Sequence, residues 1–231
     1  MKQTILQLAV AHQLPLTEHQ AQQLADFGSA LLEKNQVMNL TAITEPQAVA
    51  ELHFLDCILL TRALDFSGKR VIDVGCGAGF PGVPLKIAVP SMDLTLLDSL
   101  GKRIHWLEQE ALPEAHVEAV CVVGRAEEAA ATCREQYDIA TSRAVARLNI
   151  LAELCLPFVR VGGWFVAMKG AQARQELAEA ERAIRLLGGK VEQIFDYPIA
   201  GATHSAILVK KIKPTPRQYP RRYARIKQQP L

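Results

Sequence analysis

The chain has 231 residues, of which 49% are hydrophobic and 22% charged, a composition that excludes a disordered or collagen-like protein. Its formal net charge of +2 is unevenly distributed, because residues 210–231 contain eight Lys and Arg and no acid, which leaves −6 for the rest. This asymmetry indicates an anionic partner such as nucleic acid; the alternative is a tail that only increases solubility.

The five cysteines form no C-x-x-C pair and no pattern with histidine at zinc-ligand spacing, so we expect neither a disulfide framework nor a metal site. Polar residues interrupt the first ten positions, which therefore lack the apolar core of a signal peptide. No stretch approaches the roughly 18 apolar residues of a membrane span. The sequence predicts a cytoplasmic protein with no membrane partner.

The first third of the chain is predicted to be helical. Thr17 and Gln20 form a capping box in front of apolar residues at helical spacing. A second helix is predicted to be capped by Thr44, with Pro46 in its first turn, where a missing N–H does no harm. Residues 1–66 contain no convincing strand and are expected to form a helical N-terminal cap.

From residue 69 onward, short apolar runs alternate with helical stretches. Strands are predicted at 70–74, 93–98, 117–123, 137–141 and 163–168, and helices at 84–87, 102–111, 125–135, 147–159 and 172–187. This alternation predicts an α/β fold with a mainly parallel, Rossmann-like sheet. The last two runs, 191–197 and 205–211, are too close for a helix between them, so we expect an antiparallel pair at one end of the sheet.

The first predicted strand leads into a glycine-rich loop, Gly75-Cys76-Gly77-Ala78-Gly79-Phe80-Pro81-Gly82. Glycine lets the backbone turn tightly and approach a ligand without an intervening Cβ, so this loop indicates a ligand cradle. One register also satisfies the fingerprint G-x-G-x-x-G, and spacing alone does not exclude NAD. Asp98 ends the second predicted strand 23 residues after Gly75, close to the spacing at which an acid meets ribose hydroxyls; the alternative is an ordinary strand-end acid.

Asp73, the G-x-G-x-G core and Asp98 together resemble the S-adenosylmethionine (SAM) site of class I methyltransferases. Further segments in chain order make the resemblance specific: Asn39–Ile43, His53–Asp56, Asp73–Leu85, Leu97–Arg103, Arg125–Glu127, Thr141–Ala146 and Lys169–Gly170. From about residue 20 to the end of the sheet, the chain resembles the bacterial small-subunit rRNA guanine-N7 methyltransferases, the RsmG or GidB family.

The resemblance implies a class I SAM-dependent methyltransferase that methylates N7 of a guanine in 16S rRNA. The family's SAM contacts fall on Gly75, Phe80, Ala126, Glu127 and Arg143 of this chain, and from the loop and the ribose spacing we add Gly77, Gly79 and Asp98. The implied partner is 16S rRNA or the small ribosomal subunit. We expect the protein to act as a monomer.

The end of the fourth predicted strand, beside the methyl donor in this fold, distinguishes methylation chemistries. Enzymes resembling the amino-methylating type carry an acid or Asn and then Pro-Pro-aromatic there, whereas this chain has Thr141-Ser142-Arg143-Ala144; cytosine C5 methylation needs a cysteine, and none is placed for it. Guanine N7 has a lone pair and no proton, so alignment of the reactants and a favourable electrostatic field suffice for methyl transfer, and we assign no catalytic acid or base.

Arg143 is expected near the chemistry; the alternative is an exposed loop cation. We assign no chemistry to His53 and Asp56, which either face the cleft or form an exposed helical pair.

The end of the chain interleaves cations, prolines and two tyrosines. Such a segment is expected to be extended, with cations that bind phosphates and tyrosines that stack on unpaired bases. The RNA contacts expected are Arg217, Arg221 and Arg222 in the tail and Arg103, Arg147 and Lys169 towards the cleft.

We therefore expect a helical cap over residues 1–66, a SAM-binding methyltransferase domain over 67–211 and a basic C-terminal tail over 212–231. Two alternatives remain open from the sequence. One is a SAM-dependent methyltransferase for another RNA or a small molecule, and the other is a SAM- or nucleotide-binding RNA protein without catalysis.

Overall fold

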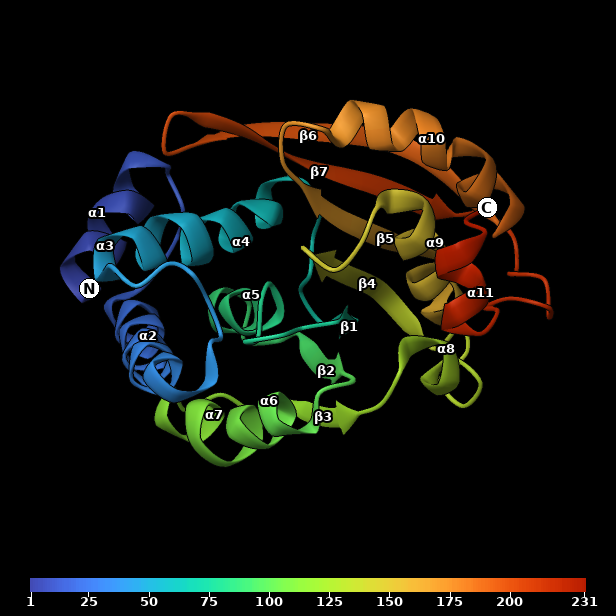
Figure 1. The fold of residues 1–231 in the computed structure, drawn as a ribbon. Coiled ribbons are helices and arrows are strands. Elements are labelled where there is room, and N and C mark those ends of the chain that lie inside the picture. The colour runs from blue at the N-terminus through green and yellow to red at the C-terminus, as the bar shows by residue number, and fades with distance from the viewer.

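The computed structural model describes residues 1–231 and contains a seven-stranded sheet with helices on both faces (Figure 1). The strands are β1 (Arg70–Val74), β2 (Asp93–Asp98), β3 (Val120–Val123), β4 (Tyr137–Arg143), β5 (Val159–Lys169), β6 (Gly189–Ile199) and β7 (Ala202–Lys211). Their order is β3-β2-β1-β4-β5-β7-β6; β1 to β5 are parallel, and β7 runs antiparallel to β5 and β6. The predicted Rossmann-like sheet with an antiparallel last strand is confirmed.

Two groups of helices cover the sheet. The first comprises α1 (Lys2–Ala11), α2 (Glu18–Met38), a helical stretch over residues 46–62 that includes α3 (Pro46–Val49) and α4 (Asp56–Ile58), α5 (Gly82–Ala88), α6 (Gly101–Trp106) and α7 (Leu112–Glu114). The second comprises α8 (Ala126–Ala129), α9 (Leu148–Cys155), α10 (Ala173–Leu186) and α11 (Tyr223–Gln228). Because side chains alternate along a strand, Val71 packs in the core of the first group and Ile72 in that of the second.

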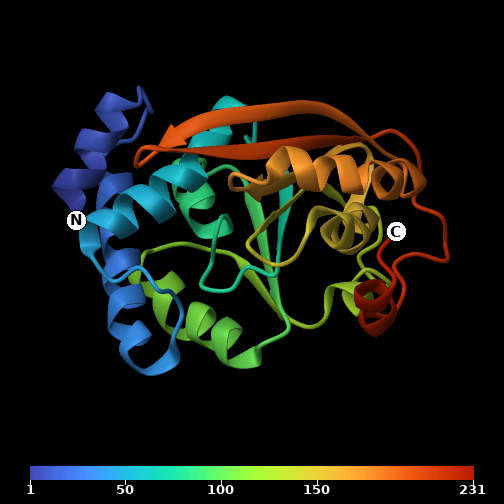
Figure 2. The same cartoon turned by 45° about the horizontal axis from the view of Figure 1, so that its top comes forward.

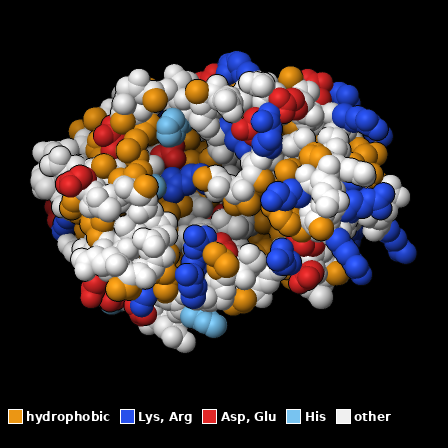
Figure 3. Space-filling model, in the orientation of Figure 1, with side chains coloured by type: hydrophobic (Ala, Val, Ile, Leu, Met, Phe, Trp, Pro, Cys, Tyr) orange, Lys and Arg blue, Asp and Glu red, His pale blue; other side chains and the backbone are white.

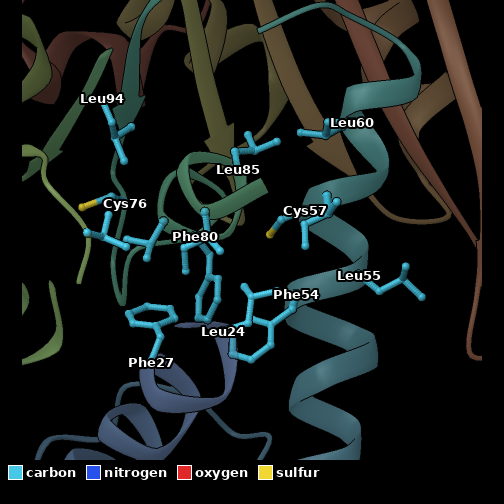
Figure 4. Close-up of a cluster of buried hydrophobic side chains, with 14 of the residues drawn as sticks. Leu24, Phe27, Phe54, Leu55, Cys57, Leu60, Cys76, Phe80, Leu85 and Leu94 are labelled. Carbon is cyan, nitrogen blue, oxygen red and sulfur yellow. The ribbon is translucent and has the colours of Figure 1, made fainter. Parts of the chain in front are cut away.

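The N-terminal helices share a hydrophobic core with the sheet and with the glycine loop. Phe27 of α2 and Phe54 of the 46–62 stretch both point towards Phe80 of the loop, with ring centroids 5.7 and 6.1 Å from that of Phe80 (Figure 4). Phe80 is only 6% exposed. The helical N-terminal part therefore fixes the position of a residue in the predicted ligand cradle.

Most local predictions for the helices are confirmed. The capping box at α2 is present, since Thr17 Oγ1 accepts from the Gln20 N–H and Gln20 Oε1 accepts from the Thr17 N–H. The second predicted helix forms, but its N-cap is Glu45 rather than Thr44. The predicted helix over residues 125–135 is wrong, because only Ala126–Ala129 is helical and the chain then turns into β4.

The C-terminal segment, residues 212–231, packs against the body beside α8 and α9 (Figures 1 and 2). Thr215, Tyr219 and Ile226 are buried, and Arg134 donates hydrogen bonds to the carbonyls of Thr215 and Tyr219. The prediction of a tail that is extended throughout is wrong, because the chain turns at residues 217–218 and is helical over Tyr223–Gln228, and Tyr219 is buried and not free to stack on a base. Apolar side chains between the cations contribute to the second core, which orders the segment.

A buried ion pair holds this segment to α9. Glu153 is completely buried, and its two oxygens accept hydrogen bonds from Arg221 Nε at 2.9 Å and Arg221 Nη2 at 2.6 Å. The backbone N–H of Arg221 also donates to Glu153 Oε1 at 2.8 Å. The bidentate geometry gives the carboxylate the partners that burial requires.

Replacing Arg221 by Ala should destabilise the protein, because it leaves the Glu153 carboxylate buried without its cation. We expect a loss of about 3–5 kcal/mol in the free energy of unfolding, measured by urea denaturation. Lys227→Ala, at an exposed position of α11, is the control and should change stability by less than about 0.5 kcal/mol. Equal effects of the two substitutions would contradict a structural role for the pair.

Candidate functional site

The loop after β1 depends on glycine at its first position. Gly75 has φ of +71°, and a Cβ there would lie 2.5 Å from Cγ2 of Val145. The N–H of Gly77 donates to Oδ2 of Asp98 at 2.9 Å, which ties the loop to the end of β2. Gly79 is placed differently from Gly75, since a Cβ there would meet Val83 at 2.8 Å in the hydrophobic core.

This loop forms one wall of a cleft of about 520 Å³, which we call the glycine-loop cleft. Its other walls are the ends of β2 and β3, the residues after β4, part of the N-terminal region and α11. Of the eight expected cofactor contacts, only Gly79 does not line the cleft. The seven that do are Gly75, Gly77, Phe80, Asp98, Ala126, Glu127 and Arg143. A volume of this size is typical of small-molecule sites.

Asp98 stands at the floor of the glycine-loop cleft and is 6% exposed. Its Oδ1 accepts from the Leu100 N–H at 2.8 Å, while Oδ2 accepts from Gly77 and lies 4.0 Å from Arg103 Nη1. Each carboxylate oxygen has a further lone pair, so Asp98 can hold the loop and still accept from a ligand hydroxyl.

Arg143, at the end of β4, lies among ring and acid partners and is not an exposed loop cation. Its guanidinium carbon lies 4.7 Å from the centre of the Phe80 ring, and Nη1 donates to Asp56 Oδ2 at 3.1 Å. Nη2 lies 3.2 Å from Nδ1 of His53. These contacts fix the planar guanidinium in one orientation.

The ring of His53 stacks on Phe80 with a centroid separation of 4.6 Å. Because a guanidinium can only donate, His53 Nδ1 must accept from Arg143, and Nε2 then carries the proton and donates to Thr41 Oγ1 at 2.8 Å. Burial and then the Arg143 cation lower the pKa of His53 to about 4. The imidazole is therefore neutral near pH 7, with both nitrogens engaged.

Asp56 is the common partner of three segments. It is 3% exposed, and besides Arg143 it accepts from the Tyr197 hydroxyl at 3.0 Å and from His204 Nδ1 at 2.8 Å. These partners come from β4 and from the two strands of the β6–β7 hairpin. His53 and Asp56 thus face the cleft region and do not form an exposed helical pair.

A second cavity, which we call the side pocket, adjoins the glycine-loop cleft. The two share His53, Arg143, Ala144 and Val145 as lining residues. The remaining walls of the side pocket include the Asp56 cluster on one side and the end of β5 with the start of α10 on the other. In Figure 3 this face has a central hollow where basic, acidic and histidine side chains meet.

The cations expected to bind RNA have different surroundings. Lys169 and Arg147 line the side pocket and pair with Glu176 and Glu179 respectively, while Arg103 lines the glycine-loop cleft. Arg221 is neutralised by Glu153, whereas Arg217 and Arg222 are exposed and have no ion-pair partner. Figure 3 shows Lys and Arg gathered over the region of α11 and the C-terminus.

Tyr223 is not among the predicted cofactor contacts, yet it lines the glycine-loop cleft from α11. Its ring lies 6.0 Å from the guanidinium carbon of Arg125. Tyr197 and His204 are also absent from the predicted site; they lie 141 and 148 positions from Asp56. The i, i+3 spacing of His53 and Asp56 was the only local signal for this cluster.

The structure shows no group of three or more His, Cys, Asp or Glu side chains arranged to hold a metal ion, and its five cysteines are free thiols. None of its helices combines the length and the apolar character needed to cross a bilayer.

Comparison with solved structures places this fold among methyltransferases. The mitomycin 7-O-methyltransferase MmcR superposes with a TM-score of 0.57 at 15% identity, covering 80% of this chain and 60% of that one. TrmN from Thermus thermophilus gives 0.52 at 16% identity, covering 71% and 53%. At these identities the likeness establishes the class I methyltransferase fold.

Sequence relatives are much closer. A ribosomal RNA small subunit methyltransferase G from Alkaliphilus oremlandii is 50% identical over 224 residues, 94% of this chain and 93% of the relative. The protein of the same name from Oceanobacillus iheyensis is 43% identical over 221 residues, with the same shares. The family model GidB, described as rRNA small subunit methyltransferase G, matches residues 20–200. The chain belongs to the GidB family of rRNA small subunit methyltransferases.

Proposed function

We propose that this protein transfers the methyl group of SAM to N7 of a guanine in 16S rRNA. The names of its family and of its relatives describe methyltransferases of small-subunit rRNA. The observation that carries the proposal is the junction of two cavities at Arg143, one suited to the cofactor and the other open for a base.

The glycine-loop cleft fits SAM. Gly75 lets the backbone line the cleft where a side chain would collide with Val145, and Asp98 offers free lone pairs to ribose hydroxyls. Phe80, Ala126 and Glu127 would hold the remainder of the adenosine and methionine moieties. Bound SAM supplies an electrophilic methyl group. Gly79, directed into the core, supports the loop without touching the cofactor.

The chemistry of guanine N7 matches the groups at the junction. N7 attacks the methyl carbon with its lone pair, the bond from sulfur to that carbon breaks, and the positive charge passes to the purine without any proton transfer. His53 has both nitrogens engaged, and Asp56 accepts from three donors, so the hydrogen bonds of both residues hold Arg143 and its neighbours in place. The site aligns the reactants and needs no general base.

We further propose that rRNA approaches over the face that contains both cavities. Arg103, Arg147 and Lys169 lie around the cavities, and Arg217 and Arg222 extend the cationic surface along the C-terminal segment. Arg221 is left out of this surface, because it lines neither cavity and both of its bonding nitrogens are held by the completely buried Glu153. Both cavities are lined by one chain, which supports action as a monomer, and a bacterial rRNA substrate implies the cytoplasm.

The direct test is to incubate the protein with small ribosomal subunits, or their rRNA, and SAM with a labelled methyl group. Digestion and mass spectrometry should detect labelled 7-methylguanosine at one position, and replacing that guanosine by 7-deazaguanosine should abolish labelling. Label in any other nucleoside would overturn the assignment to N7.

Gly75→Asp should abolish cofactor binding, because the new side chain collides with Val145 and enters the cleft. We expect S-adenosylhomocysteine affinity to fall by at least about 100-fold, or about 2.7 kcal/mol, by isothermal titration calorimetry. Ala131→Asp, which adds the same charge at an exposed position outside both cavities, should bind normally. Retained binding by folded Gly75→Asp protein would show that the loop does not cradle the cofactor.

Asp56→Asn should lower kcat more than it changes cofactor affinity. The substitution removes the negative charge that orients Arg143. Because residue 56 does not line the glycine-loop cleft, cofactor affinity should hardly change. We expect kcat for rRNA methylation to fall about 10- to 100-fold, the scale of a 1 Å misplacement, with S-adenosylhomocysteine affinity within about threefold of wild type. Asp65→Asn, at an exposed position, is the control; kcat equal to that control would exclude a positioning role.

A further inference from the structure

An ion pair in the side pocket has no role in the chemistry described so far. Lys169, at the end of β5, and Glu176, in the first turn of α10, have side chains only 8% and 14% exposed, with Nζ and Oε2 2.8 Å apart. We propose that this pair recognises the Watson–Crick edge of the target guanine, a specificity role that rests on the proposed N7 methylation.

Each member of the pair keeps at least one hydrogen-bonding position free. Lys169 Nζ donates to the carbonyl of Ala146 at 2.7 Å and forms an ion pair with Glu176 Oε2, so at least one of its three N–H groups remains free. Glu176 Oε2 accepts from the Leu148 N–H at 2.8 Å, whereas Oε1 has no hydrogen-bond partner. A donor and an acceptor therefore stand side by side in the pocket.

The other charged groups of the side pocket are already occupied. Asp56 accepts from three donors, Arg143 is held by Asp56 and His53, and Arg147 pairs with Glu179 outside the pocket. Both oxygens of Asp56 thus already accept hydrogen bonds, and Glu176 is the carboxylate of this pocket that has one oxygen with no partner.

Guanine matches this arrangement and adenine opposes it. The Watson–Crick edge of guanine has the acceptor O6 next to the donors N1–H and N2–H, so O6 meets Lys169, and N1–H and N2–H both donate to the two free lone pairs of Glu176 Oε1. Adenine has an amine and an unprotonated N1 at these positions, which places donor against donor and acceptor against acceptor.

The position of the pair also agrees with methylation at N7. In guanine, N7 and N1 lie on opposite sides of the C6 carbonyl. When N7 faces the junction at Arg143, the Watson–Crick edge faces away from the glycine-loop cleft, and Lys169 and Glu176 line the side pocket without lining that cleft.

Glu176 should contribute more to the transition state than to substrate binding. As N7 takes the methyl group, the purine becomes cationic and N1–H becomes a stronger donor. A carboxylate on that N–H then stabilises the developing charge, so its loss should lower kcat more than it raises KM.

The test compares Glu176→Gln with wild type on the RNA that the wild-type protein methylates, carrying either guanosine or inosine at the modified position. Inosine keeps N7, O6 and N1–H and lacks only the N2 amine. Because Leu148 N–H and Lys169 require the amide oxygen, the amide nitrogen of the variant must face the guanine donors. Glu181→Gln, at an exposed position of the same helix, is the matched control.

Wild type and Glu181→Gln should prefer guanosine to inosine by about 10- to 100-fold in kcat/KM. Glu176→Gln should lose at least about 10-fold in kcat on guanosine, and its preference should fall to about 1, with unchanged binding of S-adenosylhomocysteine. An unchanged preference in the variant would overturn base recognition by Glu176 while leaving N7 methylation intact. Failure of wild type to form 7-methylguanosine would instead overturn the proposed function itself.

Discussion

The buried carboxylate of Asp56 is the constraint on which the site depends. An ionised carboxylate inside a protein is costly unless hydrogen-bond donors surround it, and here the donors come from β4 and from both strands of the β6–β7 hairpin. The hydrogen bonds to this one carboxylate therefore hold the N-terminal helices, the centre of the sheet and its antiparallel edge in fixed positions relative to one another. Arg143 is fixed between the two cavities as a result.

The order of the secondary structure was predictable because its signals are local. The limits predicted for β2, residues 93–98, agree with the structure, and the capping box at Thr17 forms as the sequence indicates. The helix predicted over 125–135 failed for a nonlocal reason. Arg134 and Glu135 bind the backbone of the C-terminal segment, about 80 positions away, and periodicity carries no information about that contact.

The candidate site shows the same division. Gly75, Phe80 and Asp98 lie within or next to the loop that marks the site, so their spacing sufficed to bring them together in the prediction. The cations of the tail were judged by charge alone, and charge does not reveal that Arg221 has an internal partner in Glu153. The positions of His204 and Tyr223 depend on packing between distant elements, which one sequence does not display.

The place of Tyr223 in the glycine-loop cleft has a consequence for biosynthesis. Because α11 follows the entire sheet in the chain, a nascent protein whose strands have all emerged from the ribosome still lacks one wall of that cleft. Completion of the glycine-loop cleft is thereby linked to docking of α11 on α9. The helix that forms last thus completes the wall of the cleft that Tyr223 lines.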